Sequence, residues 1–258
     1  MNSLNLKNIA EKLINTFLNA GNVAKKISKE GVKITIKKDN SPVTNGDLEV
    51  DQIIRKEIVK LTPNIPIISE ETVNLNLVNN HKTFWLIDPI DGTKDYIKKR
   101  DEYTLNAALI IDLNPSIGMV YAPAKDRLFF SYGKGSAFEI NKGKRLVLNC
   151  KKKFAKEIIG LANSDNTPNE ILDVYKKYNV SKIIKMSSSL KFCTIAAGEA
   201  DIYAAKARAF EWDIAAGHAI LEHSGGLVTT LNEKNFKYGK KDYKNLPILL
   251  RRAKKLEE

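Results

Sequence analysis

Residues 83–96 have the sequence Thr83-Phe84-Trp85-Leu86-Ile87-Asp88-Pro89-Ile90-Asp91-Gly92-Thr93-Lys94-Asp95-Tyr96, and the rest of the chain is organised around them. The run before Asp88 is apolar and rich in aromatic residues, which predicts a buried strand. We expect that strand to end at Asp88, because Pro89 has no N–H to donate to a sheet. Gly92 is a flexible residue, and Thr93 after it is a candidate helix N-cap. Carboxylates at a strand end hold hard cations, and free N–H groups at a helix start hold phosphate. The stretch therefore predicts a place where metal and phosphate meet.

A purely structural interpretation of the same stretch is also available. It makes Asp88 an N-cap, Pro89 the first helical residue and Asp91 the acid of a capping box. Gly92 argues against it, because glycine inside a first turn weakens a helix by about 1 kcal/mol relative to alanine. The stretch alone leaves both interpretations open.

The composition is that of an ordinary soluble globular protein. With 258 residues, 43% hydrophobic and 28% charged, the chain can bury a large core as one domain or as two tightly joined halves. No signal pattern opens it, and no apolar run approaches the 18 or so residues of a membrane span. Cys150 and Cys193 have no metal or redox spacing, which predicts a cytoplasmic protein. The sequence leaves the oligomeric state open.

The charge balance favours a polyanionic partner. The chain has 42 Lys and Arg against 30 Asp and Glu, a net charge of +12. Nucleic acid is the general candidate and a phosphorylated metabolite the specific one. A coding bias toward Lys, Asn and Ile would give the same balance, so charge alone does not decide.

The first half of the chain predicts helices and an antiparallel sheet. Apolar residues at three- and four-residue steps predict a helix over residues 6–27, and alternation predicts a strand over 32–37. Thr44 with Asp47 three residues later resembles a helix cap, which makes Asp47 a capping acid unless the fold brings it to Asp91. An apolar strand from Ile65 ends in Ser69-Glu70-Glu71, a second strand that ends in carboxylates. Five further strands between residues 103 and 148, with turns at Gly133-Lys134-Gly135 and Asn141-Lys142-Gly143, predict an antiparallel meander.

The second half predicts α/β layering. After Cys150, strands and helices alternate to residue 230, which is typical of an α/β unit. The predicted fold class is therefore α/β, with an α+β half at residues 1–150 and an α/β half at residues 151–258. Glu211-Trp212-Asp213 places another carboxylate at a strand-to-helix junction, where Asp213 taken alone is an N-cap. The tail from Arg251 to Glu258 is expected to be a solvated end.

Three motifs together resemble the inositol monophosphatase superfamily. They are Ser69-Glu70-Glu71, Asp88-Pro89-Ile90-Asp91-Gly92-Thr93 and Trp212-Asp213-Ile214-Ala215-Ala216-Gly217, and the resemblance runs from about residue 4 to 250. Its members are magnesium-dependent, lithium-sensitive phosphatases, and the implied fold is a layered αβαβα sandwich with the site between the two halves. Within the superfamily, Ser41-Pro42-Val43-Thr44, residues 92–98 and residues 188–193 resemble the bacterial 3′(2′),5′-bisphosphate nucleotidases. The implied reaction removes the 3′-phosphate of adenosine 3′,5′-bisphosphate, and of 3′-phosphoadenylyl sulfate, within sulfur metabolism.

The resemblance assigns roles to particular residues. The metal ligands would be Glu70, Asp88, Asp91, Asp213 and the carbonyl of Ile90, holding two or three Mg²⁺ ions. Asp47, Glu70 and Thr93 would position the attacking water. Substrate would be held by Gly92, Thr93, Lys94, Ser188, Ser189, Lys191, Lys206, Arg208 and Asp213. Clustered carboxylates repel one another unless cations compensate, so the assignment agrees with the electrostatics.

One departure concerns substrate binding. These nucleotidases usually carry Tyr-Pro-Arg before the Trp-Asp motif, whereas this chain has Tyr203-Ala204-Ala205 followed by Lys206-Ala207-Arg208. The expected arginine falls on Ala205, and Lys206 or Arg208 is the candidate replacement. A second departure is Ser187, which stands where glycine is usual. Two alternatives remain: an inositol or sugar monophosphatase, and an inactive basic nucleotide-binding protein with the same fold. The intact carboxylates argue against the second, because clustered acids without a cation are costly to keep.

Overall fold

Two long helices form the outer layer of the first half. The computed structural model describes residues 5–37, 40–75, 80–151, 157–164 and 166–252. Helix α1 (Leu6–Glu30) buries the apolar face that its periodicity predicts. Helix α2 (Asn45–Leu61) begins with the capping box that we predicted, in which Thr44 and Asp47 hydrogen-bond each other's backbone. Between the helices, β1 (Ile34–Ile36) and β2 (Pro42–Thr44) form a short antiparallel pair.

The seven-stranded sheet confirms the predicted meander. Its order is β3-β4-β5-β6-β7-β8-β9. The strands are β3 (Ile67–Ser69), β4 (Phe84–Asp91), β5 (Thr104–Ile111), β6 (Asn114–Ala122), β7 (Arg127–Ser131), β8 (Ala137–Asn141) and β9 (Lys144–Val147). A 3₁₀ turn, η1 (Pro123–Lys125), joins β6 to β7. Strands β3 and β4 are parallel neighbours and every other pair is antiparallel. The two strands that end in carboxylates therefore end side by side.

The end of β4 differs from the sequence prediction. The strand does not stop at Asp88 but continues through Pro89 to Asp91. Its pairing with β5 is irregular between Asp88 and Asp91, so Pro89 sits in a bulge where no ladder hydrogen bond is required of it. Helix α3 (Thr93–Ile97) follows, with Gly92 at its N-cap in the left-handed conformation (φ 91°). Thr93 is thus the first helical residue rather than the cap, and the capping-box interpretation of Asp88 and Asp91 is wrong.

The second half builds a five-stranded mixed sheet of order β11-β10-β12-β14-β13. Its strands are β10 (Ile158–Ala162), β11 (Val180–Lys185), β12 (Ile202–Ala205), β13 (Leu227–Thr230) and β14 (Ile248–Arg251). Its helices are α4 (Asn169–Lys177), α5 (Leu190–Ala196) and α6 (Glu211–His223). Strands β10, β11 and β12 are parallel, as the predicted alternation of strands and helices requires, and β14 is antiparallel to its neighbours.

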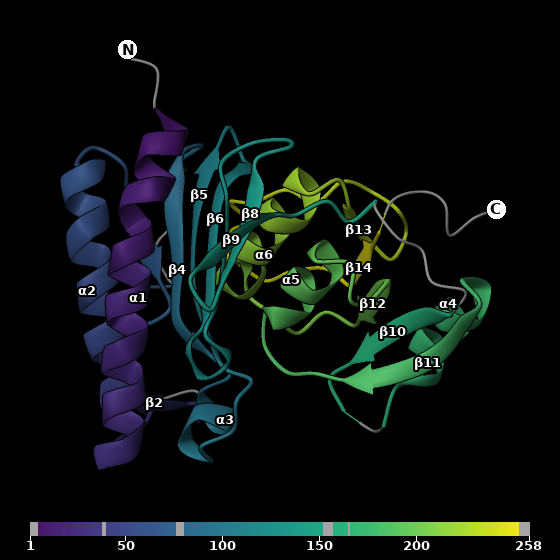
Figure 1. The fold of residues 1–258 in the computed structure, drawn as a ribbon, viewed down its shortest axis with the longest axis horizontal. Coiled ribbons are helices and arrows are strands. Elements are labelled where there is room, and N and C mark those ends of the chain that lie inside the picture. Colours follow the sequence, from purple (N-terminus) through teal and green to yellow (C-terminus); the bar gives the residue numbers. More distant parts are fainter. Residues whose placement is uncertain (1–4, 38–39, 76–79, 152–156, 165, 253–258) are drawn as a thin grey trace.

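The elements stack as the five layers that the resemblance implies (Figure 1). Helices α1 and α2 cover one face of the large sheet, and α5 and α6 pack between its other face and the small sheet. Helix α4 covers the far side of the small sheet. Gly118 on β6 shows how tightly the middle layer fits, because an added Cβ would lie 2.3 Å from the carbonyl oxygen of Ala216 on α6. The division of the chain near residue 150 stays an interpretation of the sequence.

The predicted solvated tail is wrong for its first two residues. Arg251 belongs to β14, and both Arg251 and Arg252 are buried. Arg252 Nη1 lies 3.0 Å from an oxygen of the equally buried Asp201, and its Nε donates to the carbonyl of Cys150. This ion pair ties the end of β14 to Asp201, the residue before β12. Residues 253–258 lie outside the described residues.

Candidate active site

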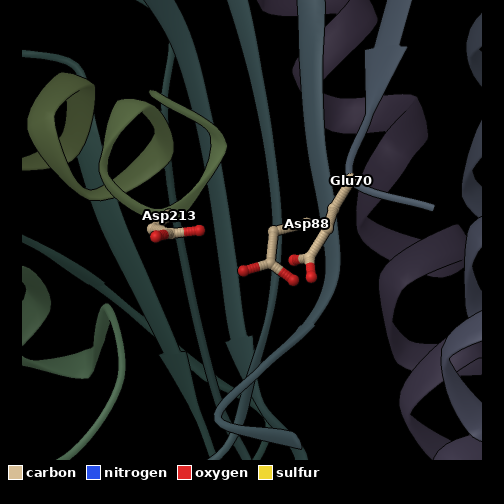
Figure 2. A group of neighbouring side chains, drawn as sticks. All are labelled: Glu70, Asp88 and Asp213. Carbon is tan, nitrogen blue, oxygen red and sulfur yellow. The ribbon is translucent and has the colours of Figure 1, made fainter. Parts of the chain in front are cut away.

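Three carboxylates from separate parts of the sequence meet at one point. Glu70 follows the end of β3, Asp88 lies on β4, and Asp213 lies in the first turn of α6. One oxygen from each lies within 4.8 Å of the others (Figure 2). Glu70 and Asp88 come together because Ser69 pairs with Ile87 in the parallel ladder, so that the next residue of each strand lies beside the other. Asp213 joins them because α6 packs against β4. Together with Asp91 we call Glu70, Asp88 and Asp213 the acidic wall.

Asp88 is a buried member of the acidic wall with an unpartnered oxygen. Its side chain is 2% exposed, and Oδ1 makes no hydrogen bond within the described part of the chain. Burial raises the pKa of Asp88 well above its ordinary value, and the neighbouring Glu70, Asp91 and Asp213 raise it further. A buried oxygen without a donor, with several carboxylates nearby, is suited to a hard divalent cation. The residues present therefore fit Mg²⁺.

Asp91 and Asp213 each have one oxygen fixed by a backbone N–H. Ser189 N–H donates to Asp91 Oδ2, and Phe210 N–H donates to Asp213 Oδ2 at 2.8 Å. Burial raises the pKa of Asp91 to about 6, although Lys191 opposes the shift. Burial and the neighbouring charge of Asp91 raise the pKa of Asp213. Asp213 is the third residue of α6, with Phe210 at the N-cap. The N-cap interpretation of Asp213 is thus wrong, because the N-cap is Phe210, three residues earlier. Asp213 Oδ1 accepts no hydrogen bond from the described residues and can bind a ligand.

The fold brings Asp47 to this site while it caps α2. Asp47 Oδ2 accepts from Thr44 N–H at 2.8 Å, and Asp47 Oδ1 lies 3.4 Å from Thr93 Oγ1. The same Thr93 hydroxyl is 3.1 Å from the Ile90 carbonyl oxygen. Burial raises the pKa of Asp47. Asp47 is therefore both a helix cap and a neighbour of Thr93, the two roles that the sequence left open.

A group of cations lies beside the acidic wall. We call Lys191, Lys206 and Arg208 the basic wall. Lys191 is 4% exposed, its Nζ donates to the carbonyl of Ser188 at 2.6 Å, and it lies 5.2 Å from the centre of the Tyr203 ring. Burial lowers the pKa of Lys191 to about 8, although Asp91 opposes the shift. Lys206 is half-exposed and forms an ion pair with Glu170 at 3.0 Å.

Two adjoining hollows connect the walls. The first is lined by all four members of the acidic wall together with Ile90, Gly92, Thr93, Lys94, Ser188 and Arg208. The second is lined by Asp91, Ser188, Ser189, Lys191, Lys206, Arg208 and Asp213. Every predicted site residue except Asp47 lines at least one hollow. The Ser189 hydroxyl is already hydrogen-bonded to Asn106 and Thr104, at 2.7 and 2.8 Å.

Sequence reasoning gave no role to several residues at the site. Lys37, just after β1, places Nζ 3.2 Å from Glu70 Oε1 and 2.9 Å from Glu71 Oε1. Burial raises the pKa of Glu71 to about 7, with Lys37 opposing the shift. Asn163 and Asn245 line the second hollow. No local pattern marks these residues, because their places depend on how distant segments pack.

The comparisons with known proteins agree with this geometry. A sequence model of the inositol monophosphatase family matches residues 5–257. The chain belongs to the inositol monophosphatase family, as its motifs predict.

Within that family, similar proteins include bacterial nucleotidases. One is the 3′(2′),5′-bisphosphate nucleotidase CysQ of Buchnera aphidicola, 39% identical over 90% of this chain and 88% of that protein. The protein of the same name from Salmonella typhimurium is 34% identical over 78% and 81%. The crystal structure of CysQ from Bacteroides thetaiotaomicron superposes with a TM-score of 0.76 and 31% identity, covering 94% of this chain and 96% of that one.

Proposed function

We propose that this protein is an enzyme that hydrolyses the 3′-phosphate of adenosine 3′,5′-bisphosphate, giving AMP and inorganic phosphate. The observation that carries the proposal is the convergence of Glu70, Asp88 and Asp213 within 4.8 Å, with an unpartnered Asp88 oxygen. The names of the similar nucleotidases support the same substrate. In the reaction, a water oxygen bonds to phosphorus, the bond from phosphorus to the 3′-oxygen breaks, and that oxygen takes up a proton.

The acidic wall would hold the metal. Glu70, Asp88, Asp91, Asp213 and the Ile90 carbonyl would bind two or three Mg²⁺ ions, with lithium and excess calcium as inhibitors. Bound Mg²⁺ supplies Lewis-acid stabilisation of the charge that develops on the phosphoryl group. These assignments come from the family motifs and are supported by the all-oxygen donor set.

The protein's own groups would position the reactants. Thr93 Oγ1, placed by Asp47 and the Ile90 carbonyl, would hold the attacking water together with Glu70. The N–H groups of Gly92 and Thr93, at the start of α3, would bind phosphate oxygens. Holding the water and the phosphate in the reactive orientation lowers the activation free energy by several kcal/mol, because the orientational entropy is lost on binding and not in the reaction step.

The basic wall would hold the phosphate that is not cleaved. A nucleoside bisphosphate keeps its 5′-phosphate, whose charge needs cations beyond the metals. Lys191 and Arg208 line the second hollow beside the acidic wall, and Lys206 or Arg208 would replace the arginine missing at Ala205. Lys94, which is exposed at the first hollow, and the hydroxyl of Ser188 complete the set.

The proposal divides the work between the two halves of the chain. Residues 1–150 would supply most of the metal ligands, and residues 151–258 would supply Asp213 and the basic wall. A cytoplasmic location and the absence of any need for nucleic acid belong to the same proposal. Among the described residues, no helix combines the length and hydropathy of a membrane span.

Phosphate release tests the proposal directly. Adenosine 3′,5′-bisphosphate and inositol 1-phosphate would be compared at fixed Mg²⁺ and after exhaustive chelation. We expect rapid, Mg²⁺-dependent release from the bisphosphate, inhibition by lithium, and much slower release from inositol 1-phosphate. Preference for inositol 1-phosphate would contradict the substrate, and full activity after chelation would contradict the metal.

A further inference from the structure

The turn that carries Glu70 is tied at its start to a buried carboxylate on α2. Ser69, the last residue of β3, is completely buried, and its hydroxyl donates to Asp51 Oδ1 at 2.5 Å. Asp51 is 6% exposed, and its second oxygen lies 3.2 Å from Arg55 Nε. Both partners hold Asp51 in place, because losing either one would leave a buried charge poorly compensated.

The far end of the same turn is tied to α2 through Arg55. Arg55 Nη2 donates to the hydroxyl of Thr72. Within the turn, the Ser69 carbonyl accepts from the Thr72 N–H at 3.1 Å. Glu70 therefore lies in a closed turn whose two ends are both connected to Asp51.

The direction of the Glu70 side chain depends on this turn. Figure 2 shows that side chain extending from the end of its strand toward Asp88. Because 28% of it is exposed, burial does not fix it, and the backbone of the turn must aim it. A ligand that is already in place loses little conformational freedom when a cation binds. Residues that hold metal ligands in position typically contribute about 10- to 100-fold to metal affinity.

Helix α2 supports the site at two points. Asp51 follows Asp47 by four residues, so both carboxylates lie on one face of the helix. Asp47 Oδ1 lies 3.4 Å from Thr93 Oγ1, whereas Asp51 contacts Ser69. Asp51 lines neither hollow, so any effect on a bound cation must pass through other residues.

We propose that Asp51 is a positioning residue for the metal: by accepting the Ser69 hydrogen bond, it holds the turn in the form that aims Glu70 at the cation. The inference rests on the proposed function, since it takes Glu70 as a metal ligand. A carboxylate that already lies beside Asp88 and Asp213 binds the ion without a rearrangement of the turn.

Metal binding in the absence of substrate tests this assignment. The probe is Mn²⁺, which takes the same oxygen ligands as Mg²⁺ and whose free ion is measured by electron paramagnetic resonance. The metal-stripped full chain would be titrated as wild type, Asp51→Ala and Asp51→Asn. We expect Asp51→Ala to raise the Kd for Mn²⁺ about 10-fold or more. Asp51→Asn should stay within about 3-fold of the wild type, because its amide oxygen still accepts from Ser69.

These variants separate positioning from charge. Both remove the negative charge of Asp51, and only Asp51→Asn keeps an acceptor for the Ser69 hydroxyl. Equal weakening of Mn²⁺ binding in the two variants would therefore assign the effect to charge and overturn the inference. Ser69→Ala removes the donor alone and should raise the Kd as Asp51→Ala does, which keeps the test decisive if Asp51→Ala does not fold.

Thr62→Ala is the control for a merely structural effect. Thr62 is buried at the other end of α2, and its hydroxyl accepts from Trp85 Nε1 at 3.0 Å. Its loss should lower the free energy of unfolding, measured with urea in EDTA, and leave the Kd for Mn²⁺ unchanged. Unchanged Mn²⁺ binding in Asp51→Ala or Ser69→Ala overturns the inference and leaves the phosphatase proposal standing. A wild type that binds no Mn²⁺ contradicts the metal site itself, and both proposals then fail.

Discussion

One member of the acidic wall, Asp88, and one member of the adjoining basic wall, Lys191, are buried to a similar extent, yet burial affects them differently. Asp88 is 2% exposed and Lys191 is 4% exposed. Lys191 has two backbone carbonyls and an aromatic ring around its ammonium group. Asp88 has an oxygen without a donor among the described residues, and four neighbouring carboxylates raise its pKa. Among the described residues, Lys191 is thus satisfied by protein groups, whereas Asp88 is left with an oxygen that a cation would satisfy. The proposed division of labour follows from this contrast.

Removing a carboxylate from the acidic wall should have the largest effect. We predict that Asp213→Asn or Asp91→Asn lowers turnover more than about 100-fold, because each removes a charged oxygen from the cation. The fold should persist, since losing one of several like charges relieves repulsion. Phosphate release and circular dichroism measure the two effects. Asp173→Asn, an exposed aspartate paired with Lys176, is the matched control and should change neither. Substantial activity in Asp213→Asn would remove the acidic wall from the mechanism.

Lys191→Ala should act on binding instead of on chemistry. We predict a KM for adenosine 3′,5′-bisphosphate raised about 10- to 100-fold, because a charge-assisted contact to the retained phosphate is lost. Hydrolysis of a simple phosphomonoester should change little, which is the pattern of a lost contact to a non-reacting group. Steady-state kinetics with both substrates measure this change. Lys176→Ala, at an exposed position of α4, is the control. Equal losses on both substrates would mean that Lys191 serves the structure and not the retained phosphate.

The two walls should also give stability slopes of opposite sign in the metal-free protein. The pKa of Asp91 is raised from 3.8 to about 6, so the folded state holds more protons than the unfolded state between these values. Its contribution to the free energy of unfolding therefore falls as pH rises from about 4 to 6. The pKa of Lys191 is lowered from 10.5 to about 8, so its contribution rises between pH 8 and 10.5. Each change is on the order of 3 kcal/mol.

Urea unfolding across pH would separate these slopes. The wild type would be compared with Asp91→Asn and with Lys191→Met, so that titrations elsewhere cancel. Added Mg²⁺ should abolish the fall between pH 4 and 6 by binding the ionised carboxylates, and should leave the slope above pH 8 unchanged. Slopes of the same sign in both differences would contradict the contrast between the walls.

The smallest expected effect comes from substituting two residues in the left-handed backbone conformation, one on each side of the site. Gly92, before α3, has φ 91°, and Ser188, before α5, has φ 56°. Gly92→Ala should cost about 1–2 kcal/mol of stability, because a Cβ is strained in this conformation. Ser188 already carries a Cβ, so Ser188→Ala should change the free energy of unfolding by about 0.5 kcal/mol or less. A Gly92→Ala protein as stable as the wild type would show that this turn adjusts freely.

The sequence predicted the members of the two walls better than the residues that surround them, and the difference has a physical cause. Glu70 and Asp88 follow apolar strands whose pairing in one sheet could be expected from their patterns. The extension of β4 to Asp91 could not, because the bulge at Pro89 depends on pairing with β5. Strand β14 was also missed, although it lies between β12 and β13 in the small sheet. Residues such as Asn163 and Lys37 reach the site only through packing between distant segments.

The identity of the product tests the central claim most directly. The claim is that the phosphate at the acidic wall is cleaved while the other stays at the basic wall. Adenosine 3′,5′-bisphosphate would be incubated with the protein and Mg²⁺, and the nucleoside monophosphate resolved by chromatography. We predict 5′-AMP as the product, and none after chelation. Formation of 3′-AMP, or no Mg²⁺-dependent product, would contradict the account.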